Sequence, residues 1–138
     1  MQRPLRVVID TNVLISGLFG LQNSPSAQLL AAFRRQRLIL VTSPAIVEEV
    51  ALVLARDRIV QRTHMEAAEQ EAFISELVDR SELTSGRQLT IPVSRDIKDD
   101  KVLACALEGQ VDYLITGDED LLALQAFAGI TIATPGSF

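Results

Sequence analysis

The chain contains no tryptophan, one cysteine and one histidine, and only 4% of its 138 residues are aromatic. A single cysteine, Cys105, excludes a disulfide within the chain, which suits a reducing cytosol. It lies in the apolar segment Val102–Leu107, far in sequence from any histidine, so we expect a core residue rather than a nucleophile. The histidine, His64, falls at the start of a predicted surface helix and is expected to face solvent.

Long apolar runs are also missing. No segment approaches the roughly 18 uninterrupted apolar residues of a membrane-spanning helix, and the N-terminal residues do not resemble a signal peptide. We therefore expect a cytoplasmic protein with no membrane partner. Apolar residues make up 48% of the chain and charged residues 22%. This is ordinary globular composition, so residues 1–138 are expected to form one domain with its own core.

A basic excess is absent too, because the net charge is −5 and the isoelectric point is about 4.8. Composition alone therefore argues against a general nucleic-acid-binding protein. However, a bound metal ion would invert the local field if the negative charge gathers at one site. The arginines form two groups, at 34–37 and 56–62, which either contact phosphate or lie on solvated helix ends.

The acidic residues lie in four clusters, each next to an apolar run. Several carboxylates that converge on one pocket repel each other unless they are protonated or neutralised by a cation. A hard divalent ion such as Mg²⁺ or Mn²⁺ prefers such oxygen ligands. The pattern therefore predicts a metal-dependent enzyme that acts on phosphate esters. The clusters are Asp10, Glu48-Glu49, Asp96 with Asp99-Asp100, and Asp118 with Asp120.

Strand-like and helix-like segments alternate along the chain, which predicts an α/β fold with a parallel sheet. Ligands bind such sheets at the carboxyl ends of the strands, where Asp10 and Asp118 both lie. The predicted strands are Leu5–Ile9, Leu38–Val41, Leu89–Val93, Val111–Thr116 and Ile130–Ala133. The predicted helices are Val13–Leu18, one from Ser24-Pro25, one from Ser43-Pro44 to about Leu54, His64–Arg80 capped by Thr63, Asp99–Glu108 and Asp120–Leu124.

Helical geometry selects between neighbouring acids. In the helix from Pro44, Glu49 falls roughly 100° from the centre of the apolar face and Glu48 roughly 160° away. Glu49 is therefore the acid that a partly buried site can recruit, and Glu48 points to water. In the later helix, Asp99 projects close to the centre of the apolar face, whereas Asp100 lies about 90° off centre. We therefore expect Asp99 to be the ligand.

Each cluster also has a purely structural interpretation, because carboxylates are favoured at helix N-termini. On that interpretation Asp10, Asp96 or Asp99 caps a helix, Glu48-Glu49 are ordinary first-turn acids, and Asp118–Asp120 form a capping turn. However, all four clusters occur at strand ends or at helix positions that face the core, and this joint occurrence favours the metal site over four separate caps.

Four segments around the acidic clusters occur in a characteristic order. They are Val7–Leu14 around Asp10-Thr11-Asn12, Ser43-Pro44 through Glu49, Asp96–Lys101, and Leu114–Asp118. Together they resemble the PIN domain family, in particular the VapC-type toxins of bacterial toxin–antitoxin pairs. The resemblance extends from Arg6 to about Pro135, and it implies a three-layer α/β/α sandwich with a central parallel sheet and a metal-dependent ribonuclease.

The resemblance also implies roles for individual residues. Asp10, Glu49, Asp99 and Asp118 match the acidic quartet of the family. Accessory positions match Asn12, Thr116 and Asp120, while Asp96 is either a helix cap or an outer group of the site. The implied reaction is RNA phosphodiester hydrolysis with Mg²⁺ or Mn²⁺ held by the quartet, in which Glu49 orients water or helps to hold a second ion. A homodimer and an antitoxin partner are implied as well.

Three other interpretations remain open. A catalytically silent PIN scaffold would bind RNA or protein partners, and would bind metal without turnover. A receiver-like phosphoacceptor domain would need paired acids after the first strand and a downstream lysine, but no lysine follows Lys101. A phosphomonoesterase with a nucleophilic aspartate commonly has a second aspartate two positions on, where this chain has Asn12.

Overall fold

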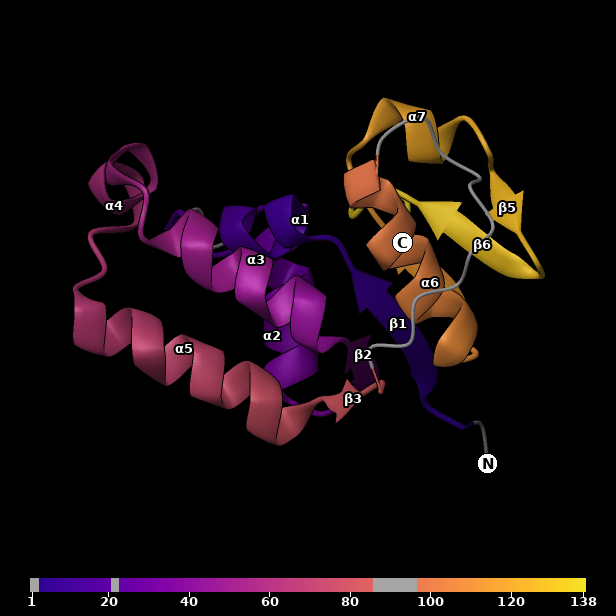
Figure 1. The fold of residues 1–138 in the computed structure, drawn as a ribbon, viewed down its shortest axis with the longest axis horizontal. Coiled ribbons are helices and arrows are strands. Elements are labelled where there is room, and N and C mark those ends of the chain that lie inside the picture. The colour runs from indigo at the N-terminus through magenta and orange to yellow at the C-terminus, as the bar shows by residue number, and fades with distance from the viewer. Residues whose placement is uncertain (1–2, 21–22, 86–96) are drawn as a thin grey trace.

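The computed structural model describes residues 3–20, 23–85 and 97–138, with the backbone alone for residues 97–100 (Figure 1). The strands are β1 (Leu5–Ile9), β2 (Leu38–Thr42), β3 (Glu82–Leu83), β4 (Tyr113–Ile115), β5 (Ala126–Phe127) and β6 (Ile130–Ala133). The helices are α1 (Thr11–Ser16), α2 (Pro25–Arg34), α3 (Pro44–Leu54), α4 (Asp57–Thr63), α5 (Ala67–Arg80), α6 (Ile97–Glu108) and α7 (Glu119–Leu122).

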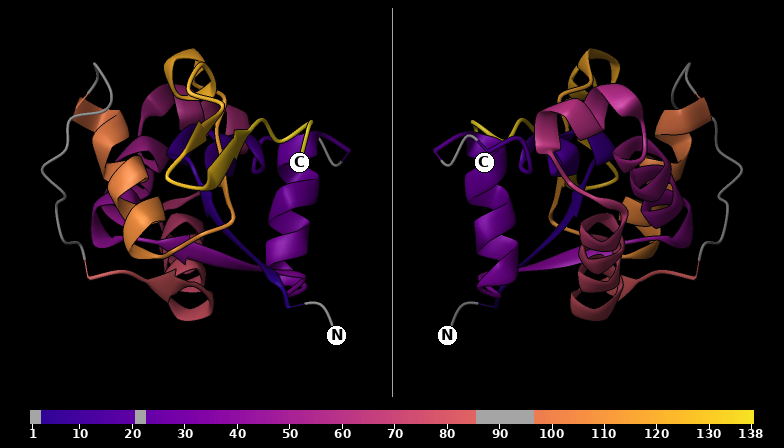
Figure 2. Two further views of the ribbon diagram at one scale, coloured as in Figure 1. Left: turned by 90° about the vertical axis from the view of Figure 1, so that its right-hand side faces the viewer. Right: turned by 90° about the vertical axis from the view of Figure 1, so that its left-hand side faces the viewer.

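The strands form one sheet in the order β3-β2-β1-β4-β6-β5, in which β5 alone runs antiparallel to its neighbour. Helix α6 contacts β1, β2 and β4, and α2 contacts β2. Figure 2 shows these two helices on opposite sides of the sheet. The predicted three-layer α/β/α fold with a central, mostly parallel sheet is therefore confirmed.

The central strand β1 fixes the position of the site. Val7 and Val8 are fully buried and Ile9 is nearly so, because helices cover both faces of a parallel sheet. Its register pairs Val8 with Leu114 and Ile9 with Ile115 of β4. Since the two strands run parallel and end level, the residues that follow them come together at one edge of the sheet.

The predicted helix starts at the two Ser-Pro pairs are confirmed. Ser24 caps α2 by accepting a hydrogen bond from the backbone N–H of Ala27, and Ser43 caps α3 in the same way with Ile46. Proline occupies the first helical position in both, where its missing N–H has no helical partner to lose.

The helix predicted over His64–Arg80 is present as α5, but its predicted start and its predicted cap, Thr63, are wrong. Thr63 ends α4, His64 is exposed with a left-handed backbone (φ +57°), and α5 begins at Ala67. Glu66 and Glu69 form a reciprocal capping box that starts α5, a signal that the apolar periodicity does not contain.

Further boundaries differ from the sequence prediction. Strands β3 and β5 were not predicted, and α7 spans Glu119–Leu122 rather than the predicted Asp120–Leu124. The predicted strand Leu89–Val93 lies outside the described residues. Cys105 is buried as expected, and burial raises the pKa of its thiol to about 11, which disfavours the thiolate. Within the described parts of the chain, no helix is long and apolar enough to cross a membrane.

Candidate active site

Asp10 and Asp118 lie at the carboxyl edge of the sheet, just beyond β1 and β4. The backbone N–H of Asp10 donates to the Ile115 carbonyl (2.9 Å), which extends the pairing of the two strands by one residue. Asp118 follows β4 after Thr116 and Gly117. The topology therefore brings together two aspartates that lie more than a hundred residues apart in sequence.

The carboxylate of Asp10 is held by two hydrogen bonds. Oδ1 accepts from the backbone N–H of Thr11 (2.8 Å), so that Asp10 caps α1. Oδ2 accepts from the Thr116 hydroxyl (2.8 Å), and the Thr116 side chain is completely buried. Both donors are uncharged, so they fix the position of the carboxylate without neutralising it.

Thr116 connects the two aspartates. Its hydroxyl donates to Asp10 and accepts from the backbone N–H of Asp118 (3.0 Å). Asp118 in turn caps α7, because its Oδ1 accepts from the backbone N–H groups of Asp120 (2.8 Å) and Leu121 (3.1 Å). The capping interpretation of Asp10 and Asp118 is thus correct, and the same hydrogen bonds aim both carboxylates at a shared edge.

The electrostatic environment of Asp10 favours its protonated form. Burial is the largest cause that raises its pKa, and the hydrogen bonds from Thr116 and Thr11 offset it only in part. The charges of Glu49 and Asp118 raise the pKa further. The carboxylates are therefore close enough to repel each other, and a cation near Asp10 would relieve that repulsion.

Glu49 approaches the site from α3. Its Oε2 accepts a hydrogen bond from the Lys101 ammonium of α6, and both side chains are about three-quarters buried. Glu48 is exposed, as the helical wheel predicts. Sequence reasoning did not select Lys101, although its position two residues after Asp99, within an acidic cluster, was a usable signal.

A pocket of about 340 Å³ opens beside the two aspartates. Asn12 lies on its wall and is exposed, whereas Asp120 is exposed and contributes its backbone N–H to Asp118. Three lining residues, Ser16, Ser26 and Pro135, were not selected from the sequence. The two serines carried no signal, while Pro135 follows β6 at the same edge of the sheet as the aspartates.

Two residues of the predicted set cannot be placed as side chains. Asp96 lies outside the described residues, and Asp99 is described only by its backbone, in the first turn of α6. Among the described side chains, no three histidine, cysteine, aspartate or glutamate residues lie close enough to hold a metal ion together. Asp10 and Asp118 are thus the two acids of the predicted quartet whose side chains line the pocket among the described residues.

The donors present fit a hard divalent cation. All of them are oxygen atoms of carboxylates and hydroxyls, which Mg²⁺ and Mn²⁺ prefer. Burial, and to a lesser extent the charges of Glu49 and Asp118, raise the pKa of Asp10, and a nearby cation would offset both effects. The structure therefore supports a metal site at Asp10 and Asp118, with Asp99 as the expected further ligand.

The larger hollow of about 680 Å³ along α5 has a different character. Two of its charged groups, Arg34 and Glu76, form an ion pair in which Arg34 donates to both carboxylate oxygens, and no acid of the predicted quartet lines it. It therefore offers no comparable chemistry.

A family model of the PIN domain matches residues 6–120. The chain belongs to the PIN domain family. The predicted family is therefore confirmed. PIN domains are generally nucleases and typically use divalent metal ions, whereas the RNA substrate and the identity of the metal remain predictions for this chain. The chain is 27% identical to the uncharacterized protein MJ1680 of Methanocaldococcus jannaschii over 121 residues, which cover 88% of this chain and 76% of that protein.

The fold also resembles a solved structure. The crystal structure of FitAcB from Neisseria gonorrhoeae matches with a TM-score of 0.56 and 15% sequence identity, covering 96% of this PIN domain chain and 99% of the matched chain. At this identity the likeness supports the shared fold and carries no residue roles.

Proposed function

We propose that residues 1–138 form a single nuclease domain that hydrolyses RNA phosphodiester bonds with Mg²⁺ or Mn²⁺. The observation that carries this proposal is the pair Asp10 and Asp118, joined through Thr116 beside a pocket at the carboxyl edge of the sheet. Asp10 has a raised pKa because burial and two neighbouring carboxylates disfavour its charge. A divalent ion would relieve this repulsion, and its charge would in turn attract a phosphate substrate.

Asp10, Asp118 and Asp99 would hold the ion, and Glu49 would orient the attacking water. When bound, the ion supplies Lewis-acid chemistry, neutralising phosphate oxygens and making water a better nucleophile at neutral pH. Thr116 holds the Asp10 carboxylate in one orientation, so no reorganisation is needed when substrate binds. Asn12, exposed on the pocket wall, would donate its amide to a phosphate oxygen.

The biological role that we propose is that of the toxin in a type II toxin–antitoxin pair. It is supported by the resemblance of the four acidic segments to VapC-type toxins. The same resemblance supports a homodimer, an antitoxin partner and a cytoplasmic location. Induced expression should then arrest bacterial growth, whereas expression of Asp10→Asn should not.

The deciding experiment incubates purified protein with labelled single-stranded RNA in Mn²⁺ or Mg²⁺, and in EDTA. We expect cleavage with metal only, and a loss of about 10³-fold or more in Asp10→Asn, because the cation site supplies several kcal/mol of transition-state stabilisation. Asparagine is as good a helix cap as aspartate, so α1 should stay intact.

The matched control is Asp112→Asn, the same change at the opposite edge of the sheet, which should cleave like the wild type. Full activity of Asp10→Asn would refute the site. Mn²⁺ binding without turnover on any RNA would favour the silent scaffold that binds RNA or protein partners.

A further inference from the structure

The ion pair between Lys101 and Glu49 differs from every other contact of the candidate site. Lys101 lies in α6 and Glu49 in α3, and the two helices are in contact. The Lys101 side chain is 27% exposed and that of Glu49 is 24% exposed. A positive charge from the protein itself is thus held against one acid of the quartet, in a partly desolvated position where charge interactions are strong.

The other described acids of the site have no such partner. Asp10 accepts hydrogen bonds from the Thr116 hydroxyl and the Thr11 N–H, and Asp118 from backbone N–H groups. Among the described residues, neither forms an ion pair with a basic side chain. Among the described side chains, the chain therefore supplies a positive charge at Glu49 and none at Asp10.

The cation at this position is a lysine, a residue that is rare in this chain. Only two of the thirteen basic residues are lysines, and both flank the acidic pair in Lys98-Asp99-Asp100-Lys101. An ammonium group is a compact, strongly hydrated point charge, whereas the guanidinium group of arginine is planar and delocalised. Among side-chain cations, the ammonium group is the nearest in size and hydration to a small metal ion.

We propose that the Lys101 ammonium takes the place of a second metal ion at Glu49. The site then binds one Mg²⁺ or Mn²⁺, on the side of Asp10 and Asp118, and Lys101 supplies the second positive charge next to the phosphate. This inference rests on the proposed function and decides between one and two ions. In two-metal nucleases two metal ions supply the positive charges that stabilise the attacking and leaving oxygens. Here the second positive charge would come from Lys101 of α6.

The consequence for metal binding follows from charge. A carboxylate that already pairs with an ammonium group is a poorer ligand, and the ammonium repels a divalent ion brought close to it. Removal of the Lys101 charge should therefore make Glu49 available as a ligand for a second ion.

The test counts Mn²⁺ ions per chain by calorimetry and electron paramagnetic resonance. Wild type should bind one ion with an isolated-ion spectrum. Lys101→Met should bind two, with the coupled signal of a close pair, and the double variant Lys101→Met with Glu49→Gln should return to one. Lys101→Arg keeps the charge and should bind one. The rate of RNA cleavage should depend on the first power of the Mn²⁺ concentration in wild type and on a higher power in Lys101→Met.

Arg37→Met is the matched control, because it removes one positive charge at an exposed position away from the acids and should leave one ion. Circular dichroism verifies that each variant is folded. Two ions in wild type, one of them lost in Glu49→Gln, would overturn the inference, and so would a single ion in folded Lys101→Met. If wild type bound no Mn²⁺ at all, the proposed function would fail, and this inference with it.

Discussion

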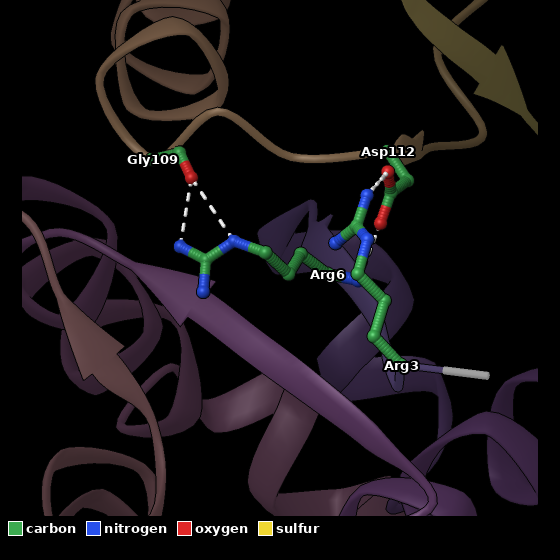
Figure 3. Close-up of polar contacts among 4 residues, drawn as sticks. All are labelled: Arg3, Arg6, Gly109 and Asp112. Carbon is green, nitrogen blue, oxygen red and sulfur yellow. Dashed lines mark hydrogen bonds and ion pairs between the residues drawn. The ribbon is translucent and has the colours of Figure 1, made fainter. Parts of the chain in front are cut away.

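The paired strands β1 and β4 have one aspartate at each edge of the sheet, Asp112 at the amino edge and Asp10 at the carboxyl edge. The surroundings of these two aspartates shift their pKa values in opposite directions. Asp112 precedes β4 at the amino edge, where its Oδ1 accepts from the Arg3 guanidinium (2.6 Å) and its Oδ2 from the Arg6 backbone N–H (2.9 Å) (Figure 3). That N–H and the Arg3 side chain lower the Asp112 pKa. Asp10 follows β1 at the carboxyl edge, where burial and like charges raise its pKa.

The difference separates a structural edge from a functional one. At the amino edge the Arg6 side chain also donates to the Gly109 carbonyl, from Nη2 (2.7 Å) and Nε (3.3 Å) (Figure 3). It pairs with Glu82 as well. Acids and bases neutralise each other there. At the carboxyl edge, the described donors to Asp10 and Asp118 are uncharged. On the proposed function, a cation from solution completes that edge.

The largest expected effect is a difference in metal-dependent stability between the two edges. A ligand at about 100 times its Kd stabilises the folded state by about 2.7 kcal/mol, which corresponds to roughly 5–10 °C in melting temperature for a chain of this size. Mn²⁺ should produce this shift in wild type and in Asp112→Asn, and none in Asp10→Asn. Differential scanning fluorimetry against EDTA measures it. An equal shift in all three proteins would place the ion elsewhere.

The next effect concerns the link between the two aspartates. Thr116→Val keeps the shape of the side chain but removes the hydroxyl that donates to Asp10 and accepts from the Asp118 N–H. RNA cleavage should fall by about 10–100-fold, as for other residues that orient metal ligands. Thr116→Ser restores the hydroxyl and should recover most of the rate. Thr131→Val, an exposed position on neighbouring β6, should cleave like wild type.

A smaller effect is expected at the amino edge. Arg6→Met removes the hydrogen bonds to the Gly109 carbonyl and the pairing with Glu82, so the free energy of unfolding should drop by about 1–2 kcal/mol. The Mn²⁺ shift in melting temperature should be unchanged. Urea denaturation with and without Mn²⁺ measures both quantities. Loss of the Mn²⁺ response in a folded variant would show that the two edges are coupled.

The comparison also explains how much the sequence could predict. Asp10 and Asp118 were predicted as site residues because an acid after a buried β-strand reaches the carboxyl edge of a parallel sheet whatever the rest of the chain does. Glu49 was chosen over Glu48 from helical periodicity alone, and the structure leaves Glu48 exposed. Their catalytic roles remain predictions.

What the sequence could not predict depends on contacts between distant segments or on local polar signals. The partnership of Lys101 with Glu49 needs α3 and α6 side by side, which no local pattern encodes. The start of α5 at Ala67 depends on the left-handed residue His64 and on a capping box, neither of which the apolar pattern contains. The edge strands β3 and β5 have two residues each, too few for an alternating pattern.

The smallest expected effect is the pH dependence of the metal-free protein, in which the two aspartates should act in opposite directions. A raised carboxyl pKa means that the folded state disfavours the charged form. Asp10 therefore costs stability once the pH rises above its ordinary pKa of 3.8, and Asp10→Asn should melt higher than wild type at pH 7 in EDTA. Below pH 3.8 the Asp10 carboxyl is protonated in both the folded and the unfolded wild type, so the higher melting temperature of Asp10→Asn should disappear.

Asp112 has a lowered pKa, so its charged form stabilises the fold above pH 3.8, and this contribution is lost as the pH falls through its folded pKa. Asp112→Asn should therefore melt lower than wild type at pH 7 and approach it in acid. The two variants have the same substitution and the same net charge, so the sign of the change in melting temperature isolates the surroundings of each carboxylate. The same sign for both variants at pH 7 in EDTA would remove the distinction between the two edges. Melting-temperature changes of opposite sign at pH 7 that both shrink towards zero below pH 3.8 would show that the charged Asp10 lowers the stability of the carboxyl edge when no cation is bound.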